Sequence, residues 1–133
     1  MYLKKEYKLI YYKDNGSLPP EYHQELIIKI HYDGTLKIKK LKGYEDQILF
    51  QYKGILQEKD LEMIQNLIEQ IDFKENRILN FNPDKFGGPL EYIELFYKNK
   101  IIKWHYPDIL KDQDQIFYEI YKIINHIYQT FAK

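Results

Sequence analysis

The sequence contains no cysteine, and it has only one arginine and one serine. The absence of cysteine excludes disulfide bonds, thiolate metal sites and a cysteine nucleophile, and it suits a reducing compartment. Ser17 stands beside prolines without a histidine–acid pattern, so we do not expect a serine hydrolase. The 20 basic residues balance the 20 acidic ones. Because Arg77 is the only residue that can form a guanidinium fork, the chain is a poor candidate for nucleic-acid binding.

Long apolar runs are also missing. Residues 1–6 contain no apolar segment of the kind found in a signal peptide, and no stretch of about 18 apolar residues could span a membrane. We therefore expect a cytoplasmic protein that does not contact a membrane. The length of 133 residues and the hydrophobic fraction of 44% predict one folded domain over residues 1–133.

The first half of the chain has the alternation of apolar and polar residues that is typical of strands. This alternation runs over residues 6–13, 23–32, 35–42 and 47–53. Asp33-Gly34 predicts a hairpin turn between the second and third strands. The pattern shifts at Lys39-Lys40-Leu41, which predicts a β-bulge or a strand end. In the fourth strand we expect Ile48, Phe50 and Tyr52 on one side.

Two amphipathic helices are predicted, over residues 58–71 and 112–132, because apolar residues recur there at spacings of three and four. Asp112 is the expected N-cap of the second helix. Residues 76–89 are predicted to be irregular, and a second hairpin is expected over 90–98 and 100–106.

The resulting order is four strands, a helix, two strands and a helix. Short connections favour antiparallel pairing, so we predict an α+β fold in which two helices pack on one face of an antiparallel sheet of about six strands. The other face stays half exposed, and four residues have the parity to line it: Lys29, His31, Lys37 and Lys103.

The four histidines are the obvious candidates for metal binding or acid–base chemistry. Their spacing forms no metal-binding motif, so we expect surface or edge imidazoles, no catalytic residue, no metal and no cofactor. The alternative is a small ligand-binding or enzymatic domain with a pocket near Trp104, His105 and Tyr106.

Two loops, 15–23 and 80–89, combine prolines with aromatic residues. Proline lowers the entropy that a loop loses on docking, and aromatic side chains supply contact area. The candidate partner-binding residues are therefore Pro19, Pro20, Tyr22, His23, Phe86, Gly87 and Gly88. Ordinary turn chemistry is the alternative, with Phe81 or Phe86 filling the core.

The segment Lys37–Lys42 is strongly basic. Alternating lysines protect the edge strand of a sheet from aggregation, which is one interpretation of this segment. A polyanion-binding surface is the other.

The order of motifs also resembles a known group of domains. A proline-containing loop precedes a strand that ends in Asp33-Gly34-Thr35, and Gly54-Ile55-Leu56 leads into a helix that ends with Ile71-Asp72-Phe73. A strand hairpin over 92–106, Pro107 and a last helix follow. This order resembles small bacterial domains of the emfourin type, which inhibit metalloproteases. The resemblance implies an α+β fold and binding to a protein rather than catalysis. Our hypothesis is a non-enzymatic protein-binding module, an inhibitor or an immunity-type protein that acts on another bacterial protein.

Overall fold

The fold is known from a computed structural model, which describes residues 7–44, 47–71, 77–79, 89–97, 100–105 and 115–131. The elements follow the chain as β1 (Tyr7–Asp14), β2 (Gln24–His31), β3 (Thr35–Lys42), β4 (Gln47–Ile55), α1 (Glu58–Ile68), β5 (Arg77–Leu79), β6 (Leu90–Tyr97), β7 (Lys100–His105) and α2 (Gln115–Phe131).

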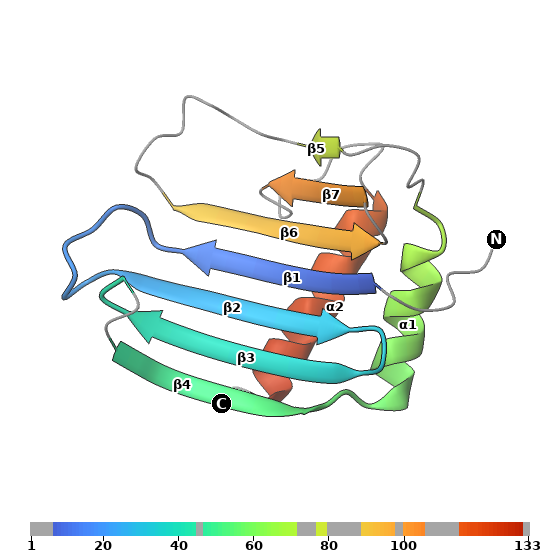
Figure 1. The fold of residues 1–133 in the computed structure, drawn as a ribbon, viewed down its shortest axis with the longest axis horizontal. Coiled ribbons are helices and arrows are strands. Elements are labelled where there is room, and N and C mark those ends of the chain that lie inside the picture. Colours follow the sequence, from blue (N-terminus) through green and yellow to red (C-terminus); the bar gives the residue numbers. More distant parts are fainter. Residues whose placement is uncertain are drawn as a thin grey trace.

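The strands form one sheet in the order β4-β3-β2-β1-β6-β7-β5 (Figure 1). Six of them pair antiparallel with their neighbours, and β5 pairs parallel with β7. The Asp33-Gly34 hairpin turn is confirmed, since Gly34 has a φ of 92° and its N–H bonds to the carbonyl of His31. The predicted α+β class is therefore confirmed.

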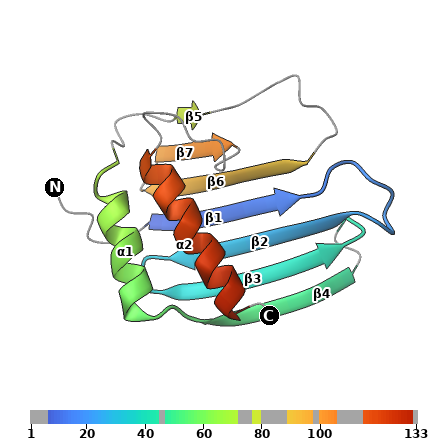
Figure 2. The ribbon, with the colours of Figure 1, turned by 180° about the vertical axis from the view of Figure 1, so that it is seen from behind.

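Both helices lie on the same face of the sheet, where α2 crosses the strands obliquely and α1 lies at one end (Figure 2). The buried residues of α2 recur at spacings of three and four, which produces one continuous apolar stripe. Glu58 and Asp60 occupy the first turn of α1, where a negative charge complements the helix dipole. The buried stripes consist of Ile64 and Ile68 in α1 and Phe117, Ile120, Ile123, Ile124 and Ile127 in α2.

Alternate strand residues complete this core from the sheet side. Trp104 is fully buried, and its ring lies 5.1 Å from that of Phe117. The strand residues of the core are Tyr7, Leu9, Tyr11, Ile28, Ile30, Leu36, Ile38, Ile93, Leu95, Ile102 and Trp104. The residues between them point to the opposite face, which no helix of the described part of the chain covers (Figures 1 and 2). We call this the open face.

The predicted bulge is present, since the pairing of β3 with β4 shifts between Lys40 and Leu41. Lys40 pairs with Phe50 but Leu41 pairs with Ile48, so one extra residue lies in β4. The prediction that Ile48 shares a side with Phe50 and Tyr52 is wrong for this reason. Ile48 is 52% exposed, whereas Phe50 and Tyr52 pack against the core.

Two further predictions need correction. Residues 77–79 were expected to be irregular, but they form β5, whose three residues are too few to produce a periodic pattern. The edge-protection interpretation of Lys37–Lys42 is also wrong, because this segment is β3, which lies between β2 and β4. Asp112 lies outside the described residues, so its capping role stays a prediction.

Within the described ranges, no helix has both the length and the apolar character that crossing a membrane requires.

Replacing Ile124 with alanine tests how the sheet and helices are held together. Ile124 is completely buried at the centre of the α2 stripe. Removing its side chain leaves a cavity, so the free energy of unfolding should fall by about 2–5 kcal/mol. Gln129→Ala, on the exposed side of the same helix, should change it by less than about 0.5 kcal/mol. Equal effects in urea denaturation would show that the stripe is not buried.

Candidate protein-binding surface

The first predicted loop joins β1 to β2, and its side chains divide into two groups. Pro19, Pro20 and Tyr22 are exposed, and Tyr22 exposes 64% of its surface. His23 is only 3% exposed, so it supports the loop from inside and does not itself present a surface. Phe86, Gly87 and Gly88 lie outside the described residues, as does Phe81.

His23 holds the loop through both ring nitrogens. Nδ1 lies 2.8 Å from the carbonyl oxygen of Gly16, and Nε2 lies 3.1 Å from Oε1 of Glu25. Both partners are acceptors, so a ring nitrogen that carries a hydrogen can donate to the one beside it. The ring also stacks on Tyr44 with centroids 3.8 Å apart. The Tyr44 hydroxyl donates to the carbonyl of Leu18 at 2.7 Å, which ties the β3–β4 turn to the β1–β2 loop.

Asn15 closes the base of the same loop. Its side-chain oxygen accepts a bond of 2.8 Å from the Gln24 N–H, and its amide nitrogen donates to the Tyr22 carbonyl at 2.9 Å. The N–H groups of Tyr22 and His23 both bond to the carbonyl of Pro19. These bonds satisfy backbone N–H and C=O groups of the loop, which favours a single loop conformation.

Asp14 joins the loop to the neighbouring strand β6. Its Oδ1 accepts bonds from the N–H groups of Gly16 and Leu90, at 2.9 and 3.1 Å. Its Oδ2 accepts the Tyr12 hydroxyl at 3.0 Å. Burial, together with the adjacent Asp14 carboxylate, raises the pKa of Tyr12 above its usual value. Leu90, the first residue of β6, therefore lies beside the base of the β1–β2 loop.

Tyr44 has an unusual backbone that these contacts stabilise. Its φ is 55°, and a bulky residue seldom adopts this left-handed conformation. Stacking on His23 and the bond to Leu18 hold it there. Strain of this kind is often found at functional sites.

The β1–β2 loop and the β3–β4 turn lie at the same end of the sheet (Figure 1), and five large apolar residues belong to this loop, this turn and the beginning of β4. All of them are more than one-third exposed. We call this group the apolar tip, which consists of Leu18, Tyr22, Tyr44, Ile48 and Leu49. The prediction named Tyr22 alone of these five as a binding residue. Tyr44, Ile48 and Leu49 had no local signal, because only the sheet brings the β3–β4 turn and the beginning of β4 to the same end as the loop.

The expectation that all four histidines are surface or edge imidazoles is wrong for two of them, which are buried and belong to or adjoin inner strands. His23 is buried as described, and His105 is 6% exposed, with its ring 5.8 Å from that of Tyr92. Burial lowers the pKa of His105, with a smaller contribution from Lys103. His126 is exposed as predicted. Within the described ranges, no three histidine, aspartate or glutamate side chains gather into a group that could hold a metal ion.

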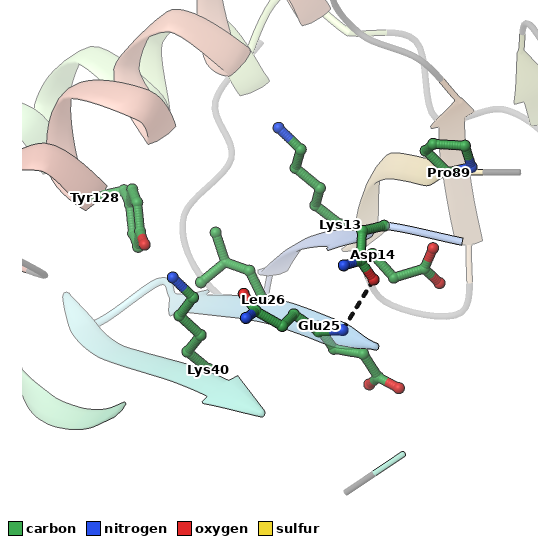
Figure 3. A pocket seen from close by; sticks show the side chains of 9 residues that line it. Lys13, Asp14, Glu25, Leu26, Lys40, Pro89 and Tyr128 are labelled. Carbon is green, nitrogen blue, oxygen red and sulfur yellow. Dashed lines mark hydrogen bonds between the residues drawn. The ribbon is translucent and has the colours of Figure 1, made fainter. Parts of the chain in front are cut away.

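Of the three residues named for the alternative pocket, Trp104 is fully buried in the core and His105 is buried as well, whereas Tyr106 lies outside the described residues. A hollow of about 390 Å³ lies elsewhere, between β1–β3 and the last part of α2. Figure 3 shows Lys13, Leu26 and Lys40 projecting to the side on which Tyr128 lies. The three strand residues are direct neighbours in the sheet, with Leu26 between the two lysines.

A scan of the chain against models of known protein families gives no match, and a search of curated proteins gives none either.

Replacing His23 with phenylalanine tests whether the loop depends on this side chain. Phenylalanine keeps a ring that can stack on Tyr44, but the buried carbonyl of Gly16 and the Glu25 carboxylate lose their partner. We expect a loss of about 1–3 kcal/mol in the free energy of unfolding, and faster amide exchange at Tyr22 and Gln24. His126→Phe, at an exposed position, is the control. Unchanged exchange in the His23 variant would show that the loop does not need the imidazole.

Proposed function

We propose that this domain is a non-enzymatic protein-binding module of the inhibitor or immunity type, and that it docks on another protein through the apolar tip. In such a module the binding itself is the activity. The observation that carries the proposal is that Tyr22, the most exposed aromatic residue of the tip, lies on a loop whose backbone is fixed from inside.

Exposed apolar groups on a rigid loop favour association for two reasons. Grouped apolar side chains at a surface mark interaction sites, and tyrosine is enriched among the residues that dominate binding energy. A loop that is already ordered loses little entropy when it docks. The contacts of His23 and Asn15 thus support binding without touching the partner.

Within the part of the chain that the structure describes, His23 and Glu25 form a histidine–carboxylate pair at 3.1 Å. A general base must reach the proton that it removes from a substrate. The His23 ring lies beneath Tyr44 and has both nitrogens occupied, so it suits a structural role. This supports binding over catalysis.

The tip can be tested against the partner recovered from source cells with tagged protein. Once the partner is identified, Leu18→Ala and Tyr22→Ala should each weaken its affinity by about tenfold or more, because they remove apolar contact area. The control is Tyr32→Ala, since Tyr32 is an exposed aromatic residue at the opposite end of β2. The melting temperature should stay unchanged in all three. Unchanged affinity in both tip variants would rule out docking through the tip.

A second candidate function is the binding of a small amphipathic anion in the hollow beside α2. Its volume is within the usual range for ligand pockets, roughly 300–1,000 Å³. Leu26 offers an apolar floor, and Lys13 and Lys40 flank it. Within the described part of the chain, neither lysine has a carboxylate within 4.0 Å. The adjacent Asp14 and Glu25 carboxylates are bonded to the loop and to His23.

Octanoate, with octanamide as its neutral counterpart, is a suitable probe for this hollow. Octanoate should shift the methyl resonances of Leu26, and Lys40→Gln should weaken its binding several-fold, because a cation no longer faces the carboxylate. Lys59→Gln, on α1, serves as the charge-matched control. Equal binding of octanoate and octanamide, or no shift at Leu26, would exclude an anion site there.

A further inference from the structure

Three lysines form a row across the open face. Lys29 of β2 pairs directly with Lys37 of β3, and Lys37 pairs directly with Lys53 of β4. Directly paired residues in an antiparallel sheet point to the same face, so the three side chains stand next to one another. We call Lys29, Lys37 and Lys53 the lysine row. Neighbouring strands are about 4.8 Å apart, so the row is about 10 Å wide.

The row lies in a hollow of about 440 Å³. Lys39, two residues beyond Lys37 on the same face, adds a fourth ammonium group to its lining. Lys39 pairs with Ile27 of β2 on one side and with Gln51 of β4 on the other. Ile27 adds an apolar side chain to the lining of the hollow, and Gln51 adds a polar one. Among the lining residues that the structure describes, none is an aspartate or a glutamate.

Fold stability does not explain this arrangement. Like charges directly opposite each other destabilise a sheet, and natural sheets gain from opposite-charge pairs. On β6 and β7, the open face follows this rule, because Lys103 pairs with Glu94. The lysine row does not, and the ion pairs in the part of the chain that the structure describes, His23–Glu25 and Lys122–Glu119, lie elsewhere.

The neighbouring His31 responds to the same concentration of positive charge. Burial lowers its pKa, and Lys8, Lys37 and Lys29 lower it further, while Asp33 acts in the opposite sense. Lys37 and Lys29 of the row thus add to the larger effects of burial and Lys8 on the pKa of His31.

We propose that the lysine row binds an acidic segment of the partner protein, an inference that rests on the proposed protein-binding function. Along an extended peptide, alternate side chains lie about 6.6 Å apart, which matches the spacing of Lys37 and Lys39 on β3. Carboxylates at alternate positions can thus meet alternate lysines, while Ile27 receives an apolar neighbour.

The same surface is less suited to single-stranded nucleic acid. Such sites combine a basic groove with aromatic rings on which bases stack. Tyr52, the aromatic residue among the described lining residues, turns its ring to the other face, where the ring centroid lies 5.2 Å from that of Phe131. The charge is also carried by lysines alone, without the planar fork of arginine.

The test uses three labelled probes: a short peptide in which Glu alternates with Thr, the same peptide with Gln, and an oligothymidylate of equal charge. Fluorescence anisotropy should detect binding of the Glu peptide, weakening as salt rises, and little binding of the others. Lys37→Glu should reduce the affinity by roughly tenfold or more, because a carboxylate then faces the peptide. Lys59→Gln/Lys122→Gln, on the helices, should leave it unchanged.

Lys37→Glu also separates binding from folding. It converts both cross-strand pairs into opposite-charge pairs, so the melting temperature should stay level or rise while binding is lost. Tighter binding of the oligonucleotide would assign the row to nucleic acid and overturn the proposal. Glu-peptide binding that is absent, or that survives in Lys37→Glu, would overturn it as well. None of these probes carries a large apolar side chain that could bind the apolar tip. A negative result with them would therefore exclude the lysine row as a binding site but would not bear on docking through Leu18 and Tyr22.

Discussion

The burial of two helical stripes against one face of the sheet is the interaction on which the other features depend. The stripes of α1 and α2 require an apolar partner, and each long strand supplies it through every second residue. The intervening residues are then placed on the opposite face, which no described helix covers. This arrangement uses one surface for stability and leaves the other for lysines that a core could not accommodate without counter-ions.

The two proposed recognition surfaces arise from different parts of this framework. The apolar tip depends on polar groups that are satisfied within the loops, above all those of His23, Asn15 and Asp14. The lysine row depends only on strand register, because a shift by one residue would turn its side chains toward the core. A partner that contacts both would gain apolar contact energy from the tip, while the charged row would favour fast and selective association.

Much of the fold could be predicted from residue patterns, because apolar periodicity reports which face is buried. The Asp33-Gly34 turn and the change of pattern near Lys40 were local signals of this kind. Pairing between distant segments gave no such signal. The short strand β5 depends on a parallel neighbour, and the exposure of Ile48 depends on an extra residue in β4. The burial of His23 was missed because Tyr44, which covers it, is distant in sequence.

The most direct test of a one-sided sheet compares adjacent isoleucines that point to opposite faces. A soluble gadolinium agent relaxes methyl protons that it can approach, and dilute protein avoids self-association. Ile27 and Ile101 should be strongly relaxed, whereas the buried Ile28 and Ile102 should be protected. Similar relaxation within each pair, or protection of all four residues, would contradict the account, because the open face would not be accessible.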